Sequence, residues 1–297
     1  MRKIALATSN EYSDLTRDDR LVLDKLLYCG VDVEPIVWDA KHVAWHQFDA
    51  VFIRSCWDYH LRHEQFFKWI EDLEQEGVTV FNPPEILRKN YHKKYLKALD
   101  EKQITVVPTV WADKNAPPQL APLLADQGWQ QAVLKPVISA NANETWATST
   151  ASAAADQGKL EEMLHAHSEI MVQKFIEEIK TNGEWSFIFF EGEFSHAVLK
   201  MPKEGDFRVQ EHFSREFIGK RPPPHLLEQA QKVIAAIEDI CLYARVDGIE
   251  VEKQLLLMEL ELIEPSLYLD KHPRAPGRFA EAIIAAMNSL SSKEHPH

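Results

Sequence analysis

Residues 245–266 read RVDGIEVEKQLLLMELELIEPS, a run of Leu, Ile, Val and Met residues that also carries six acids, among them Asp247, Glu259, Glu261 and Glu264. Burying a lone carboxylate costs several kcal/mol, so acids in such a run need an explanation. If the run forms two strands joined by a tight turn near Lys253, Asp247 lies directly across from Glu259, and Glu261 lies two residues further along the same face. The pattern therefore predicts a β-hairpin on which three carboxylates converge.

Two interpretations of this hairpin remain open on the segment alone. The alternation in MELELIE is typical of a half-exposed strand, so the acids can belong to a solvated sheet face. Like charges that face each other destabilise a sheet, so the acids can instead bind divalent cations. The choice depends on chemistry elsewhere in the chain.

Composition narrows the class of partner. The chain has 297 residues, with 45% hydrophobic and 27% charged residues and a formal net charge of -13. This exceeds the usual domain of about 100–200 residues, so two or three subdomains are expected. Nucleic acids and anionic membranes both need a basic surface, so neither is expected as a partner.

The cellular compartment is predicted from the cysteines and the apolar runs. Cys29, Cys56 and Cys241 are far apart and form no CxxC motif, which favours a reducing cytoplasm over a disulfide framework. The start, MRKIALATSN, has no long apolar stretch, so no signal peptide is expected. No apolar run approaches the roughly 20 residues that span a bilayer.

The first ninety residues alternate strand-like and helix-like patterns, which predicts a parallel sheet with helices on its faces. Strands are expected at 3–8, 32–38, 48–55 and 78–82, and helices at 18–30 and 64–77. Ligands of such sheets bind near the carboxyl ends of strands, which points to the segments TSNEYSD and RSCWDYH.

The rest of the chain predicts a smaller α/β unit and then an antiparallel region. A helix that begins at the prolines after Asn82 is expected to give way to a short strand ending at Pro108. Further strands are expected at 131–137, 143–150, 169–176, 184–192, 193–202 and 206–213, and helices at 157–167, 224–243 and 277–290. The helix over 224–243 has an apolar stripe of Leu226, Val233, Ile237 and Ile240.

Basic residues mark candidate anion sites in this acidic chain. Lys135 ends an apolar strand and precedes a loop of small residues, ISANANE, whose backbone N–H groups can approach phosphate oxygens. Lys200, Lys203 and Arg208 surround a turn in KMPKEGDFRVQ. A lysine that extends from a strand end into solvent and a solvated cationic loop are the alternatives.

The order of these residues resembles the ATP-grasp superfamily of ligases. Lys93 comes first, then Lys135 before a small-residue loop, the QKFI hinge, Glu184 and Arg208, and finally Asp247 with Glu259 twelve residues later. KPV, GEWSFIFFEGEFSHAVLK, GDFRVQ and LLMELELIEPSLYL are most similar to the branch that contains the D-cycloserine-forming O-ureido-D-serine cyclo-ligase. Glutathione synthetases and ribosomal-protein glutamate ligases are more distant.

The resemblance implies an α/β fold, α+β in the C-terminal half, in which an ATP-grasp unit follows a Rossmann-like N-terminal α/β domain. It implies three domains: an N-terminal domain over 1–90, a central lid domain over 91–176, and a C-terminal domain with the metal site over 177–297. It also implies ATP and Mg²⁺ as cofactors, with Mn²⁺ as the other candidate ion.

The resemblance assigns a role to each candidate residue. The residues that would bind ATP are Lys93, Lys135, Gln173, Lys174, Phe175 and Glu184, with the backbone of Lys174 and Phe175 at adenine. The metal ligands would be Asp247, Glu259 and Glu261, and the catalytic residues Arg208 and Lys200. Arg54, Trp57, Glu264 and Ser266 are candidates for the substrate site. A structural salt bridge for Arg54 and a turn cap for Glu264 remain alternatives.

The implied function is ligation of a carboxylate on a small amino-acid-like substrate to an amine or similar nucleophile, through an acyl phosphate. ADP and phosphate would be released, and a homodimer stays open. An ATP-binding regulatory or scaffold protein is the rival hypothesis, because the chain has few glycines where the family has glycine-rich loops. Asn141 and Asn143 tolerate left-handed backbone and can partly substitute for them.

Overall fold

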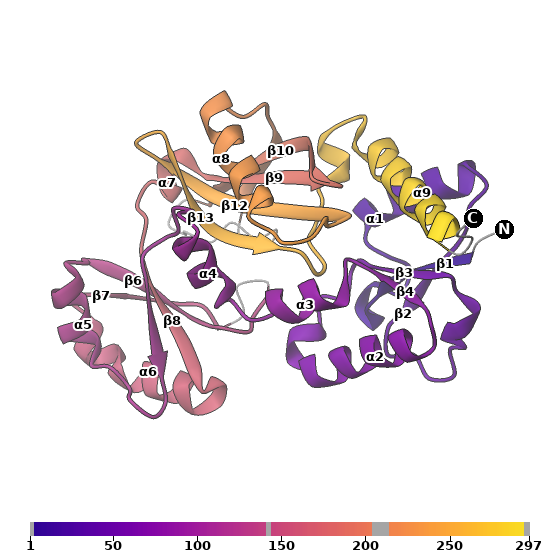
Figure 1. Cartoon of the computed structure of the whole chain (residues 1–297). Helices are drawn as coiled ribbons and strands as arrows, with labels where there is room; N and C mark the ends of the chain where they lie inside the picture. Colours follow the sequence, from indigo (N-terminus) through magenta and orange to yellow (C-terminus); the bar gives the residue numbers. More distant parts are fainter. Residues whose placement is uncertain (1–2, 141–143, 204–213, 294–297) are drawn as a thin grey trace.

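The computed structural model describes residues 3–140, 144–203 and 214–293. Within these residues the strands form three sheets, each with helices beside it (Figure 1). The mixed α/β fold that the sequence predicts is confirmed. No helix of the described residues is long and apolar enough to cross a membrane.

The N-terminal sheet is parallel, with the strand order β2-β1-β3-β4. Its strands are β1 (Lys3–Thr8), β2 (Asp32–Val37), β3 (Ala50–Ile53) and β4 (Thr79–Phe81), and its helices are α1 (Arg17–Tyr28) and α2 (His63–Gln75). Thr16 caps α1 by accepting a hydrogen bond from the Asp19 backbone N–H. The predicted alternation of strands and helices is therefore confirmed, and the segments after β1 and β3 lie at one edge of this sheet.

A second core belongs to an antiparallel sheet with the order β5-β8-β6-β7. Its strands are β5 (Thr109–Asp113), β6 (Gln131–Pro136), β7 (Trp146–Ser149) and β8 (Glu169–Lys174), and its helices are α5 (Leu120–Gln127) and α6 (Ala153–His167). Leu120, Leu160 and Ile170 are fully buried between the two helices and the sheet. This core holds residues 110–172 alone, whereas Met171 on the other face of β8 belongs to a cluster with Phe187 of the largest sheet.

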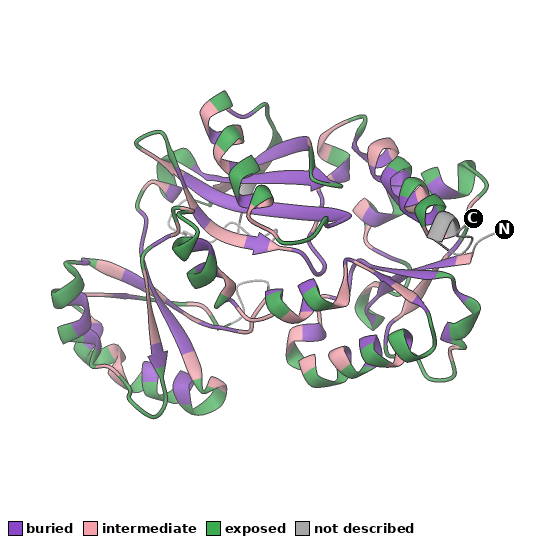
Figure 2. Cartoon of the chain, viewed as in Figure 1, coloured by how far each residue is buried: buried purple, intermediate pink, exposed green. Residues whose placement is uncertain are grey.

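The largest sheet is also antiparallel, with the order β11-β10-β9-β12-β13. Its strands are β9 (Glu184–Phe190), β10 (Glu193–Pro202), β11 (Ser214–Gly219), β12 (Tyr243–Val251) and β13 (Gln254–Glu261). The helices nearby are α7 (Ile179–Asn182) and α8 (Pro224–Ala235). Every residue of β9 is buried, which explains why the strand EWSFIFF is apolar except for Glu184 and Ser186 (Figure 2).

The final helix, α9 (Ala275–Lys293), returns to the N-terminal part of the chain and lies beside α1 (Figure 1). Phe279 of this helix stacks on Phe190 of β9, with ring centroids 4.8 Å apart. Ile4 and Phe52 of the N-terminal sheet belong to the same buried cluster. One hydrophobic core therefore joins the N-terminal sheet to the largest sheet.

Three predicted elements differ in the structure. The helix after Asn82 is broken into α3 (Pro84–Asn90) and α4 (Tyr95–Glu101), because Lys93 between them donates its backbone N–H to Val137. In place of a strand that ends at Pro108, residue Val106 makes a single bridge to Leu257, and β5 follows.

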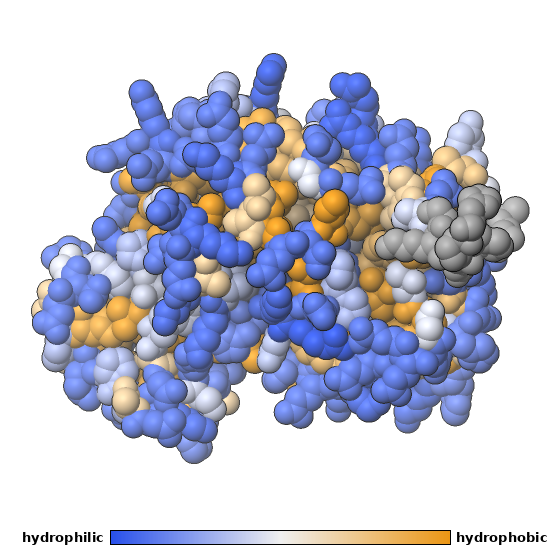
Figure 3. All heavy atoms as spheres, viewed as in Figure 1, coloured by the Kyte–Doolittle hydropathy of each residue, from blue (hydrophilic) through white to orange (hydrophobic). Residues whose placement is uncertain are grey.

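The third difference lies in α8, after β10. Helix α8 ends at Ala235, and Ile240 is 78% exposed, so this residue does not belong to the apolar stripe. The strand predicted over 206–213 lies outside the described residues, and β11 follows it. Figure 3 shows hydrophilic residues over most of the visible face, with hydrophobic residues in patches between them.

Candidate active site

A cleft of about 1000 Å³ is lined by residues of all three sheets. The N-terminal sheet contributes Tyr12 and Trp57 from the two segments that the sequence pointed to. Lys135 reaches the cleft from β6, and Glu259 from β13. The cleft therefore brings together aromatic and charged side chains that lie far apart in the sequence.

The hairpin of β12 and β13 places the acids as predicted. Asp247 pairs with Glu259 across the strands, and one oxygen from each of Asp247, Glu259 and Glu261 lies within 4.8 Å of the others. The turn itself has two residues, Glu252 and Lys253, with φ of 50° and 67°. Such a turn alone would shift the pairing by one residue, and a bulge after Asp247 restores it.

The bulge depends on Gly248. A Cβ atom at this position would lie 2.8 Å from the Leu256 carbonyl oxygen and 2.7 Å from a methyl carbon of Leu255. A backbone atom cannot easily move away, so only glycine fits here. The sequence DG therefore provides both the Asp247 carboxylate and the glycine that sets its register.

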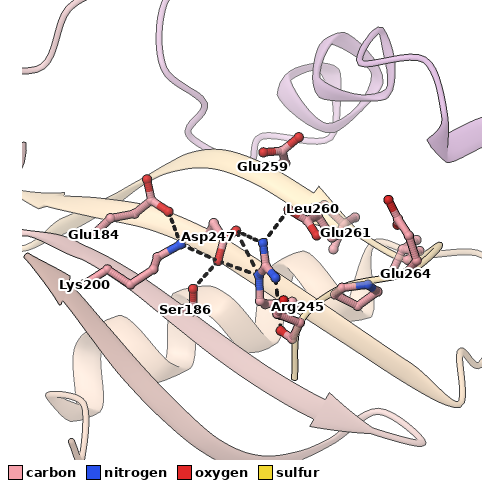
Figure 4. A network of polar contacts seen from close by, with 12 residues as sticks. Glu184, Ser186, Lys200, Arg245, Asp247, Glu259, Leu260, Glu261 and Glu264 are labelled. Atoms are coloured by element: carbon pink, nitrogen blue, oxygen red, sulfur yellow. Dashed lines mark hydrogen bonds and ion pairs between the residues drawn. The ribbon is translucent and has the colours of Figure 1, made fainter. Parts of the chain in front are cut away.

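Arg245 and Ser186 hold Asp247 in place, as Figure 4 shows. The Arg245 guanidinium donates to Asp247 at 2.9 Å and also contacts Glu261, and the Ser186 hydroxyl donates to the other Asp247 oxygen. Burial would raise the pKa of Asp247, but Arg245 and Lys200 hold this pKa below its ordinary value. Asp247 is thus ionised and fixed in orientation.

Glu259 and Glu261 face the cleft, and their pKa values are shifted in opposite directions. Glu259 pairs with Lys93; burial opposes ionisation, but Lys93 and then Lys135 keep the pKa of Glu259 below its ordinary value. Burial raises the pKa of Glu261 to about 7, although Arg245 opposes this shift. The positive charges of Lys93, Lys135 and Arg245 therefore largely offset the negative charges of this cluster.

The surroundings of Lys135 and Lys200 shift the pKa values of the two lysines in opposite directions. Lys200 pairs with Glu184 and lies 3.6 Å from Asp247; burial would lower its pKa, but these two carboxylates raise it above the ordinary value. For Lys135, burial outweighs the attraction of Glu259 and lowers the pKa to about 8. Within the described residues no acid forms an ion pair with Lys135. Its ammonium group can therefore bind an added anion.

The three carboxylates fit a divalent cation by their chemistry, since Mg²⁺ and Mn²⁺ prefer carboxylate oxygens. Glu259 and Glu261 are partly exposed to the cleft, whereas Asp247 is 2% exposed and already accepts hydrogen bonds. Figure 4 shows Glu259 pointing away from the sheet, free of the Arg245 network. The metal role of the three acids stays a prediction.

The hinge at the end of β8 also lines the cleft through Gln173, Lys174 and Phe175. The backbone N–H of Lys174 donates to Pro108 at 2.8 Å, and that of Phe175 donates to Gln131 at 3.1 Å. These two N–H groups are therefore occupied within the protein, and the expected backbone contacts with adenine stay a prediction.

The candidate substrate residues divide into two groups. Arg54 is 1% exposed and donates to Asp19 at 2.8 Å and to the Pro265 carbonyl at 2.9 Å. The salt-bridge alternative therefore holds for Arg54, and the proposed contact with substrate is wrong because the guanidinium is enclosed. Trp57, Glu264 and Ser266 all line the cleft.

Three of the predicted residues lie outside the described part of the chain, and one residue of the site was not predicted. Arg208 lies outside the described residues, as do Asn141 and Asn143, so their roles stay predictions. Arg245 was missed, although the sequence contained a signal. Residues two apart on a strand face the same way, so RVD on a predicted strand places a guanidinium beside the Asp247 carboxylate.

Comparison with known proteins agrees with the resemblance that the sequence showed. Residues 4–82 match the family model of the N-terminal domain of D-cycloserine synthetase DcsG. The cycloserine biosynthesis protein DcsG of Streptomyces lavendulae is 25% identical over 299 residues, which cover 94% of this chain and 97% of that protein. The crystal structure of DcsG superposes with a TM-score of 0.82 at 23% identity, and covers 94% of this chain and 98% of its own.

More distant structures share the fold. D-alanine–D-alanine ligase from Bacillus anthracis, solved with ATP, has a TM-score of 0.71 at 14% identity and covers 99% of both chains. An ATP-grasp RimK domain protein from Sphaerobacter thermophilus has a TM-score of 0.68 at 14% identity and covers 94% of this chain and 98% of its own. The chain therefore has the ATP-grasp fold, and along most of its length it is similar to the D-cycloserine synthetase DcsG.

Proposed function

We propose that this protein is a cytoplasmic, ATP-dependent ligase that joins a carboxylate on a small amino-acid-like molecule to an amine or similar nucleophile. The observation that carries the proposal is the meeting of three carboxylates with Lys93 and Lys135 in one cleft. Such a set of charges suits a nucleotide with a divalent cation. The similarity to DcsG and to a D-alanine–D-alanine ligase supports the same class of reaction.

The residues of the cleft would act mainly by position and charge. Lys93 now neutralises Glu259, and Arg245 neutralises Asp247 and Glu261. Mg²⁺ held by these acids would supply positive charge to the phosphates of ATP. Lys93 and Arg245 would then be free to meet phosphate oxygens. Lys135 would approach the same phosphates from β6.

The reaction would proceed in two steps. The substrate carboxylate attacks the terminal phosphorus atom of ATP, the bond to ADP breaks, and an acyl phosphate forms. An amine or similar nucleophile then attacks the acyl carbon, and phosphate leaves. Arg245 and Lys200, both buried beside Asp247, lie where they can stabilise negative charge on the transferred group.

ADP release tests this proposal. The purified protein is given Mg²⁺, ATP and single candidate acids, among them D- and L-amino acids and O-ureido-D-serine. At least one acid is expected to stimulate ADP release well above the background without acid. Glu259→Gln should keep the fold, judged by circular dichroism, and release at least tenfold less ADP, because a metal ligand is lost. ATP binding without stimulation by any acid would favour the scaffold hypothesis.

A further inference from the structure

Glu264 is a buried carboxyl group in the wall of the cleft that lacks a cationic partner. Its side chain is 7% exposed and lines the cleft. Among the residues that the structure describes, the only hydrogen-bond donor to its carboxyl group is its own backbone N–H. No dashed contact reaches Glu264 in Figure 4, although Asp247 and Glu261 beside it are both engaged.

Every other strongly buried acid of the cleft has such a partner. Asp19 accepts from Arg54, Glu184 pairs with Lys200, and Asp247 pairs with Arg245. Burial without a partner is costly for a carboxylate, and it raises the pKa of Glu264 to about 8, with the Glu261 charge adding to the shift. A cation that enters the cleft would remove this cost and let Glu264 ionise.

The backbone of Glu264 is held by Trp57, which packs against Tyr12. The Trp57 indole N–H donates to the Glu264 carbonyl oxygen at 3.0 Å, and its ring meets Tyr12 edge-on at 4.9 Å between centroids. Trp57 and Tyr12 both line the cleft. Aromatic rings that line the same cleft as a carboxyl group suit an organic cation.

Two other occupants fit less well. Glu264 does not belong to the group of acids whose ligand atoms lie within 4.8 Å of one another, so it does not extend the cation cluster. A substrate carboxylate would be repelled by Glu264 and by the neighbouring Glu261. An ammonium group can donate three hydrogen bonds in a compact volume and carries the charge that this site lacks.

We propose that Glu264, beside Trp57, binds the ammonium group of the amino-acid substrate and so selects amino acids over acids without an amine. This inference rests on the proposed function, because it places the substrate in the same cleft. It assigns Glu264 a binding role and no part in the chemical step. The carboxylate to be activated would then point away from Glu264, toward the acids that are predicted to hold the metal.

Paired ligands test the inference by binding alone. D-alanine, D-serine and O-ureido-D-serine are compared with the acids that lack only the amine, namely propionate, 3-hydroxypropionate and 3-(ureidooxy)propionate. Calorimetry with Mg²⁺ and a non-hydrolysable ATP analogue should show at least tenfold tighter binding for one or more amino acids. Equal affinity within every pair, or no binding of any amino acid, would overturn the inference whatever the result for ADP release.

Variants then assign the preference to the residue. Glu264→Gln should remove the preference for the amine and leave binding of the deaminated acid unchanged, because the shape is kept and the charge is lost. Glu264→Asp, which keeps the charge, should retain part of the preference and covers the case in which the first variant fails to fold. Glu193→Gln, at an exposed position where β10 begins, should keep the full preference.

The proposed function and this inference fail in different ways. If no acid stimulates ADP release, the ligase proposal fails, while the paired binding result still stands. If ADP release occurs and Glu264→Gln keeps the preference for amines, only the role of Glu264 is wrong. An equal loss of kcat for both members of a pair, with KM unchanged, would also contradict a binding role.

Discussion

Lys135 shows how a single residue can couple the cleft to pH. It ends β6, lines the cleft, and has a pKa lowered to about 8 because burial disfavours its charged form. The folded protein therefore holds this proton less tightly than an unfolded chain, whose lysine has a pKa near 10.5. Lys135 opposes folding below about pH 8, and this opposition fades as the pH rises toward 10.5.

Nucleotide binding should show the consequence. Phosphate oxygens favour the charged ammonium group, so binding above pH 8 must return a proton to Lys135. We expect the Kd of an ATP analogue with Mg²⁺ to rise about tenfold between pH 7 and pH 9. Lys135→Arg keeps its charge throughout and should remove most of this rise. The same pH profile in both proteins, measured by calorimetry, would exclude Lys135 as the titrating group.

At the scale of elements, the hairpin shows what sequence reasoning can and cannot reach. The pairing of Asp247 with Glu259 was predicted from a turn symmetric about Lys253. The structure reaches the same pairing with a two-residue turn and a bulge, whose effects on register cancel. Alternation and spacing therefore predicted the acids, whereas the bulge depends on the steric fit of Gly248, which a one-dimensional pattern does not contain.

The missed features share a cause. The break between α3 and α4 follows from a hydrogen bond between Lys93 and Val137, and the enclosure of Arg54 follows from Asp19 and the Pro265 carbonyl. Each depends on a contact between distant parts of the chain. The local patterns gave most of the strands correctly because period and turn residues are local properties.

Substitutions at two glycines test whether the bulge needs glycine, because one glycine lies in the bulge and the other lies at an open helical position. Gly248→Ala should lower the free energy of unfolding by about 1–3 kcal/mol, because the new Cβ would collide with the Leu256 carbonyl oxygen. It should also weaken stabilisation by Mg²⁺ and ATP, because Asp247 moves. Gly158→Ala, on the exposed face of α6 with open space around it, should raise stability by about 0.5–1 kcal/mol. Urea unfolding measures both, and an unaltered Gly248→Ala would mean that the bulge is not needed.

At the scale of the whole molecule, the distribution of the cores predicts which parts unfold together. One buried cluster contains Ile4 and Phe52 of the N-terminal sheet, Phe190 of β9 and Phe279 of α9. The Tyr243 hydroxyl of β12 donates to the Ile53 carbonyl at 2.8 Å, which adds a polar tie between the same two sheets. One face of the sheet of β5 to β8 has a core of its own, while Met171 on its other face shares a smaller contact with Phe187 of β9. We therefore expect two cooperative units in this protein, although its three sheets are distinct.

Two cavity-forming variants test this division by hydrogen exchange. Phe279→Ala removes a fully buried ring and should cost about 3–5 kcal/mol. Exchange should then rise in β1 and in β9 alike, because both lose the same core, and stay unchanged in β6 and β8. Leu160→Ala should give the reverse pattern, with faster exchange in β6 and β8 and none in β1. Faster exchange in β1 but not in β9 after Phe279→Ala would show that α9 stabilises the N-terminal sheet alone. The two walls of the cleft would then be held together by something other than this core.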